Sequence, residues 1–217
     1  VHQTFPPDGI TNTTCTAQRI RPPTHGHLEN TLPSMAAALE AGAEAVEVDV
    51  HRTADGHLAV FHDATLDCRT DGTGRPEDHT LEELRGLDLG HGYTADDGAT
   101  YPLRGTGTGL LVTLPEVFEA FPDQRFVIDI KGGRADDGEA VAAFLATLPA
   151  EDRAQQIVYG GAAAERVEAL LPEVTTITRR GLKDCLKGYL ATGWLGRVPQ
   201  TCHDTWIVVP ANYTWLL

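Results

Sequence analysis

The sequence has few basic residues: 17 lysines and arginines stand against 31 aspartates and glutamates in 217 residues. The net charge of −14 and the pI near 4.9 argue against binding to nucleic acid, because a phosphate backbone requires a basic surface. They also argue against attachment to an anionic membrane by charge alone. No apolar run is long enough for a membrane-spanning helix. The surplus carboxylates serve solubility, or some of them hold a cation.

Cysteines are also scarce, and the four at positions 15, 68, 185 and 202 form no C-x-x-C pair. Their spacing therefore argues against a structural zinc site or a thioredoxin-like motif. A disulfide between Cys185 and Cys202 fits an exported protein, whereas the alternative is two unpaired thiols in a cytosolic one. The disulfide slightly favours an extracytoplasmic or secreted location over a cytoplasmic one.

Short β-branched runs alternate with stretches rich in alanine, leucine and glutamate, and no G-x-G-x-x-G motif or internal repeat is present. This alternation predicts an α/β fold with parallel strands and helical crossovers, either an open doubly wound sheet or a closed (β/α)8 TIM barrel. Strands are expected at residues 14–19, 45–50, 58–62, 125–131, 156–159, 174–178 and 205–209. Helices are expected at residues 32–41, 80–84, 114–121, 138–148, 162–171 and 182–191.

The expected domain organisation is a single barrel domain over residues 1–217, with a long inserted loop at about 63–114. Seven strands can be counted, and the chain stops inside an apolar run. We therefore expect a fragment that is truncated after about seven strands and lacks the last strand and helix, since an incomplete barrel leaves unpaired edges.

Two carboxylates follow each other on the strand expected at residues 45–50. Side chains alternate along a strand, so Glu47 and Asp49 share one face and Val48 lies on the other. Adjacent buried carboxylates repel each other, and a divalent cation with oxygen ligands, Mg²⁺ or Ca²⁺, resolves this repulsion. The alternative is a polar edge that faces solvent.

Two further groups lie near strand ends. His62 ends the next strand, where a barrel places catalytic groups, and its ordinary pKa suits proton transfer near neutral pH. Taken alone, such a histidine is more often structural. Asp129 and Lys131 share a face of a later strand. They could hold a metal and a phosphate oxygen, or simply form a salt bridge.

Several motifs in order along the chain resemble the glycerophosphodiester phosphodiesterase family. They are densest between about residues 16 and 131. The motifs are Glu29-Asn30-Thr31, residues 42–50 (GAEAVEVDV), Thr53-x-Asp55-Gly56, Val60-Phe61-His62-Asp63 and Arg69-Thr70-Asp71-Gly72-x-Gly74.

The resemblance implies a TIM barrel that hydrolyses glycerophosphodiesters to glycerol 3-phosphate and an alcohol with one divalent cation. It implies that the metal ligands are Glu47, Asp49 and Asp129, the last in place of the family's usual glutamate. It also implies that His62 is one of two catalytic histidines and that Arg19 and Lys131 bind phosphate.

One departure from the family pattern concerns the other histidine. The family has His-Arg-Gly where this sequence has Gln18-Arg19-Ile20, and Gln18 cannot exchange a proton near pH 7. Three explanations compete: a natural inactive relative, an enzyme that works with one histidine and a metal-bound water, or an altered stretch of an otherwise normal enzyme. The rival functions are a protein that binds a phosphodiester or metal without turnover and another metal-dependent TIM-barrel lyase or isomerase.

Overall fold

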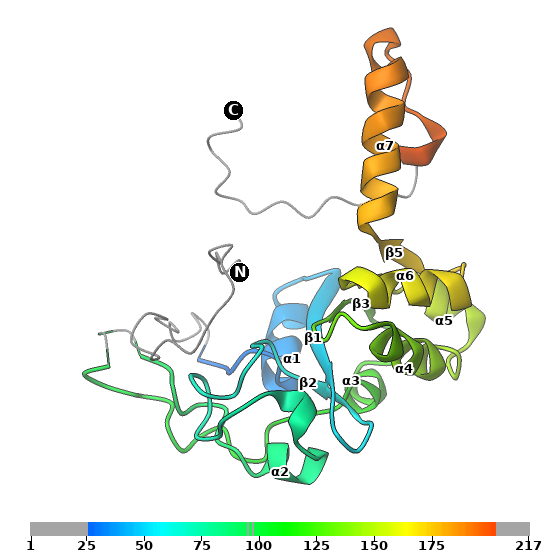
Figure 1. Cartoon of the computed structure of the whole chain (residues 1–217). Coiled ribbons are helices and arrows are strands. Elements are labelled where there is room, and N and C mark those ends of the chain that lie inside the picture. The colour runs from blue at the N-terminus through cyan, green and yellow to red at the C-terminus, as the bar shows by residue number, and fades with distance from the viewer. Residues whose placement is uncertain (1–25, 95, 97, 203–217) are drawn as a thin grey trace. The chain divides into compact units, whose positions relative to one another are not determined.

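Five strands form one open sheet in this computed structural model, which describes residues 26–94, 96 and 98–202. The sheet has the order β2-β1-β3-β4-β5, and the neighbours from β1 to β5 run parallel. Figure 1 shows how the chain passes from strand to helix and back. The strands are β1 (Ala45–Arg52), β2 (Leu58–Val60), β3 (Arg125–Ile130), β4 (Ile157–Tyr159) and β5 (Thr175–Ile177).

The pair β1–β2 runs antiparallel, so the expectation of parallel strands is wrong at this edge. The reason is a tight turn in the Thr53-x-Asp55-Gly56 motif. The Thr53 hydroxyl donates to Asp55 Oδ1 at 2.6 Å and accepts from the backbone N–H of His57 at 2.8 Å. Gly56 has a φ of +87°, a conformation that side chains disfavour. The turn therefore returns the chain along β1 instead of leading into a helix.

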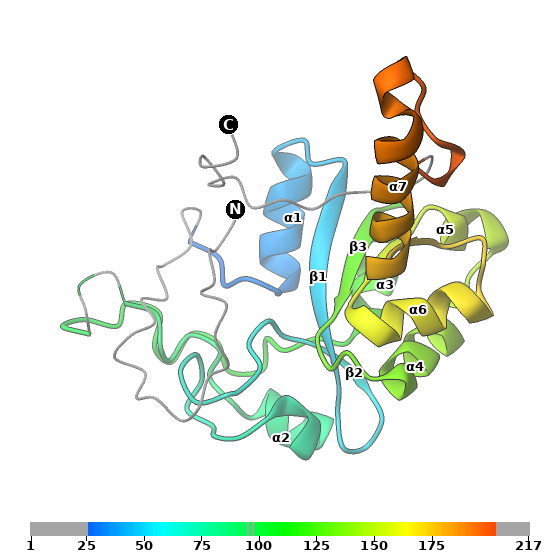
Figure 2. The ribbon, with the colours of Figure 1, turned by 45° about the horizontal axis from the view of Figure 1, so that its top comes forward.

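Valines alternate along β1 and build the main hydrophobic core. Val46, Val48 and Val50 are buried on one face of the sheet, as the sequence predicts, and they pack with apolar side chains of β3. Figure 2 shows the helices that accompany the sheet. Those that contribute to this core are α1 (Leu32–Glu40), α3 (Leu114–Ala120), α4 (Ala135–Leu145) and α6 (Gly161–Leu170).

The segment between β2 and α3 is long and mostly irregular. Its regular elements are η2 (Pro76–Asp78) and α2 (Leu81–Arg85), and α2 begins with the capping box predicted at Thr80 and Glu83. A second hydrophobic core lies under this segment. The buried carboxylate of Asp88 accepts backbone N–H groups from Gly90, Gly105 and Gly107 at 2.6–3.0 Å. The glycine-rich stretch at residues 105–109 (GTGTG) is thus anchored to a buried charge.

Residues 179–202 belong to a second compact unit, which we describe by itself. It contains α7 (Arg179–Thr192), η3 (Gly193–Leu195) and η4 (Gln200–Cys202). A disulfide between Cys185 and Cys202 joins α7 to η4, so of the two alternatives the structure has the disulfide and not the unpaired thiols. The short helix α5 (Ala150–Ala154) was not expected.

The strands expected at residues 14–19 and 205–209 lie outside the described residues, so the count of seven strands stays a prediction, as does the single domain. Within the described part of the chain, no helix is both long enough and apolar enough to span a membrane.

We expect Asp88→Ala to lower the free energy of unfolding by at least about 1.5–3 kcal/mol, because three backbone N–H groups lose a charged acceptor. Urea denaturation measures this change. Asp136→Ala is the control, since that carboxylate forms an exposed ion pair with Arg134 and should cost roughly 0–1 kcal/mol. Equal losses in the two variants would contradict the anchoring role of Asp88.

Candidate active site

Three carboxylates gather on the neighbouring strands β1 and β3. The parallel register places Asp49 directly opposite Asp129, and Glu47 lies two residues earlier on the same face of β1. Each of the three offers an oxygen, and these oxygens all lie within 4.8 Å of one another. Asp49 and Asp129 are buried, whereas Glu47 is exposed. The structure therefore brings together the three predicted metal ligands.

Lys131 bridges the two buried aspartates. Its Nζ lies 2.8 Å from Asp49 Oδ1 and 2.5 Å from Asp129 Oδ2. Burial raises the pKa of Asp129 in spite of this ammonium group. The pKa of Lys131 is also raised, because the attraction of the two carboxylates outweighs the effect of burial. The structure confirms the salt bridge between Asp129 and Lys131, and it places Asp129 in the acidic cluster; that the pair holds a metal and a phosphate oxygen stays a prediction.

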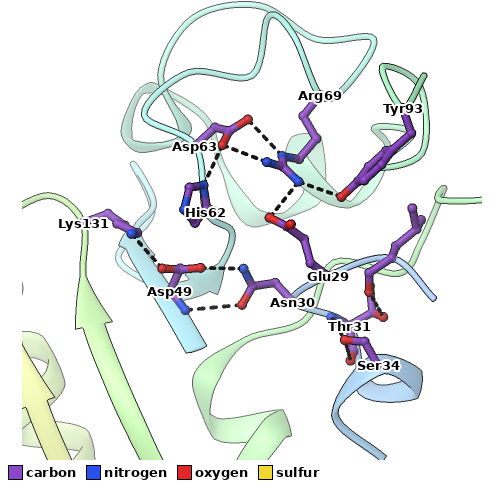
Figure 3. Close-up of polar contacts among 11 residues, drawn as sticks. Glu29, Asn30, Thr31, Ser34, Asp49, His62, Asp63, Arg69, Tyr93 and Lys131 are labelled. Carbon is purple, nitrogen blue, oxygen red and sulfur yellow. Dashed lines mark hydrogen bonds and ion pairs between the residues drawn. The ribbon is translucent and has the colours of Figure 1, made fainter. Parts of the chain in front are cut away.

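Two polar side chains orient the ligands. Asn30 donates its amide to Asp49 Oδ2 at 2.8 Å and accepts the backbone N–H of Asp49 at 3.3 Å (Figure 3). Asn30 has a φ of +56°, in the left-handed region that asparagine tolerates better than most residues. The Tyr159 hydroxyl at the end of β4 donates to Glu47, and the pKa of Tyr159 is strongly raised by burial and by this carboxylate.

His62 reaches this site because β2 turns back along β1. The backbone N–H of Phe61 donates to the carbonyl of Asp49 at 2.9 Å, so His62 follows directly beside the acidic cluster, as Figure 3 shows. The ring Nδ1 lies 2.7 Å from Asp63 Oδ1. Burial alone would lower the pKa of His62, but the hydrogen bond to Asp63 and the charge of Asp49 raise it.

Asp63 is held in turn by the buried guanidinium of Arg69. Arg69 Nε and Nη2 each donate to the Asp63 carboxylate at 2.9 Å. Its Nη1 donates to the Tyr93 hydroxyl at 2.6 Å and lies 2.7 Å from Glu29 Oε1. Burial would raise the pKa of Asp63, but His62 and Arg69 hold it far below its ordinary value. Asp63 is therefore ionised across the whole range of ordinary pH.

A hollow opens beside these groups, and its lining includes Asn30, His62, Arg69 and Tyr93. The hollow brings His62 beside the side-chain amide of Asn30 that orients Asp49. The lining includes four residues of the polar network, Glu29, His62, Arg69 and Tyr93. It also includes Asn30, which hydrogen-bonds Asp49 of the acidic cluster, so the two groups of side chains form one candidate site.

Two predicted site residues, Gln18 and Arg19, lie outside the described residues. Sequence reasoning assigned no role to Asn30, Asp63 and Arg69, although each belongs to a motif that carried the family resemblance. Those motifs were the signal that could have found them. Tyr159 had no such signal, because a tyrosine at the end of a short strand is ordinary.

The donor set of the acidic cluster fits a hard divalent cation. Three carboxylates offer only oxygen, which Mg²⁺ and Ca²⁺ both prefer, and two of them come from buried positions where unpaired negative charge is unfavourable. Glu47, Asp49 and Asp129 would therefore hold the ion.

Comparisons of the sequence and of the structure with known proteins all point to one family. Residues 19–144, more than half of the chain, match the model of the glycerophosphoryl diester phosphodiesterase family. A glycerophosphodiester phosphodiesterase of Caldanaerobacter subterraneus is 40% identical over 104 residues, which are 48% of this chain and 39% of that protein. One of Bacillus altitudinis is 43% identical over 76 residues, or 35% of this chain and 31% of that protein. The chain thus spans between about a third and two fifths of these relatives.

Solved structures agree on the fold. A glycerophosphodiester phosphodiesterase of Agrobacterium tumefaciens matches with a TM-score of 0.56 and 26% identity over 69% of this chain and 60% of that one. An Oleispira antarctica phosphodiesterase, solved with the product sn-glycerol-3-phosphate, has the same score and identity over 71% and 62%. These proteins are TIM barrels, so the chain has this α/β fold class, of which the structure describes an open sheet.

We expect Mg²⁺ or Ca²⁺ to raise the melting temperature of this chain. A ligand at 100 times its Kd stabilises a folded protein by about 2.7 kcal/mol. Asp49→Asn should abolish the increase, because it removes a charged ligand at the centre of the cluster. Thermal melts with and without the ion measure the effect.

Asp136→Asn serves as the control for this measurement, since it removes the same charge from an exposed position outside the cluster. An increase of equal size in both variants would show that the ion binds elsewhere.

Proposed function

Because the chain belongs to the glycerophosphoryl diester phosphodiesterase family, we propose that it hydrolyses glycerophosphodiesters to glycerol 3-phosphate and an alcohol with the help of a divalent cation. The observation that carries this proposal is the convergence of Glu47, Asp49 and Asp129 beside Lys131 and His62. The relatives are named for this activity, and one neighbour was solved with sn-glycerol-3-phosphate.

We place the phosphate of the substrate beside the acidic cluster. A bound Mg²⁺ or Ca²⁺ would supply Lewis-acid polarisation of the phosphodiester. A phosphate next to three carboxylates needs cationic partners from the protein as well, and Lys131 stands directly at the cluster. We assign Lys131 to a phosphate oxygen, together with Arg19, whose guanidinium suits two oxygens at once.

Hydrolysis forms a bond from phosphorus to a water oxygen and breaks the bond from phosphorus to the alcohol oxygen. The water loses a proton and the leaving alcohol gains one. His62 is suited to the second transfer, because its raised pKa keeps more of the ring protonated near neutral pH. The family uses a second histidine for the other transfer, and Gln18 stands in its position.

Gln18 favours a second candidate function, which is binding of a phosphodiester or metal without turnover. Loss of one partner in general acid–base catalysis costs roughly 10²- to 10⁴-fold in rate. We therefore expect weak or no activity in the chain as written.

The disulfide between Cys185 and Cys202 supports an extracytoplasmic or secreted location, because such bonds persist in oxidising compartments.

The decisive assay measures release of glycerol 3-phosphate from glycerophosphocholine with Mg²⁺, with Ca²⁺ and with a chelator. It compares the chain as written with Gln18→His/Ile20→Gly, and we expect the double variant to be faster by roughly 10²- to 10⁴-fold. Asp49→Asn in the double variant should remove the metal-dependent rate.

Metal-dependent turnover in the unaltered chain would show that one histidine suffices. No turnover in either protein, although both fold and bind the metal, would favour binding without catalysis.

A further inference from the structure

Arg69 opens a motif, Arg69-Thr70-Asp71-Gly72, for which the proposed reaction has so far no use. Its side chain is buried, with 3% of the residue exposed. Removing a guanidinium from water is unfavourable, and here two carboxylates and a phenol compensate it: Asp63, Glu29 and Tyr93. These partners come from three separate stretches of the chain, which Figure 3 shows converging on the guanidinium.

The contact with Asp63 fixes a plane as well as a charge. Arg69 donates two hydrogen bonds of 2.9 Å, one to each carboxylate oxygen, and a planar fork of this kind holds a carboxylate in a single orientation. Oδ1 then remains at 2.7 Å from His62 Nδ1. A lysine at position 69 could supply the charge but not the two parallel bonds.

The orientation of Asp63 determines the tautomer of His62. An ionised carboxylate is an acceptor only, so the proton between the two groups resides on Nδ1 of the ring. In the neutral ring, Nε2 is then the nitrogen that takes or returns a proton. We propose that Arg69 is a positioning residue that acts through Asp63 to hold the ring of His62 in the Nδ1–H tautomer.

This inference rests on the proposed function only for its kinetic consequence; the tautomer is a property of the folded chain. A merely structural Arg69 would tie the loop segments together and contribute to stability alone. If Arg69 is a positioning residue, loss of its two hydrogen bonds to Asp63 must also change the tautomer of the His62 ring. The experiment separates these two roles.

The first measurement is ¹⁵N NMR of the nine histidine rings in the full chain, with His62→Gln to identify the resonances of His62. In the unaltered chain we expect neutral His62 to carry its proton on Nδ1. In Arg69→Lys we expect a mixture of tautomers, and in Asp63→Asn a shift toward Nε2–H, because the asparagine amide can donate to Nδ1.

The second measurement is kcat and KM for glycerophosphocholine in whichever of the two proteins, unaltered or Gln18→His/Ile20→Gly, turns over faster. We expect Arg69→Lys to lower kcat by roughly 100-fold with little change in KM, as for a misplaced catalytic group.

Arg153→Lys is the matched control. Arg153 is partly buried and lies 2.6 Å from a carboxylate oxygen of Glu173, and its described polar contacts include none of the site residues. Arg153→Lys should leave both the His62 tautomer and kcat unchanged. Both Arg153→Lys and Arg69→Lys should lower the melting temperature of the protein.

A folded Arg69→Lys variant with an unchanged His62 tautomer would overturn the proposal, whatever happens to kcat. A changed tautomer supports it even when neither protein turns over, so its failure and the failure of the proposed function remain distinguishable. Asp63→Asn tests the second half of the same link, and an unchanged His62 tautomer in that variant would also overturn the proposal.

Discussion

The repulsion between two aspartates is the constraint around which the site is built. Asp49 and Asp129 lie opposite each other because β1 and β3 are parallel and in register, and both are buried. Their negative charge in a region of low dielectric must be compensated. Lys131 supplies a cation between them, Asn30 donates to Asp49, and the remaining oxygens suit a divalent ion. Burial raises the pKa of Asp129 in spite of the neighbouring Lys131.

His62 stands between this cluster and a second group of charges. On one side is the carboxylate of Asp49, and on the other is Asp63, which Arg69 holds. The hairpin formed by β1 and β2 makes this possible, because it brings Phe61, the residue before His62, back beside Asp49. The turn motif at Thr53 thus contributes to the site although it lies apart from the chemistry.

The sequence predicted what depends on local periodicity. Alternation along residues 45–50 placed Glu47 and Asp49 on one face and the valines in the core, and both placements are confirmed. It could not predict that Arg69 meets Asp63, Glu29 and Tyr93, because those contacts join distant segments through irregular loops. The antiparallel course of β2 was missed for another reason: a short apolar strand looks the same in either direction, and the turn chemistry that decides the direction was seen only as a family motif.

The energetics of Arg69 favour a role beyond holding loops together. A buried ion pair is often no more stabilising than well-packed apolar side chains of similar size, because each charge must first lose its hydration. If tying three segments together were the only requirement, the neighbouring core of leucines and Tyr93 could meet it without a buried charge. A fork that fixes the plane of one carboxylate provides something that apolar packing cannot, which is a defined direction for a hydrogen bond. That direction ends at Nδ1 of His62, which lies beside Asp49 of the acidic cluster.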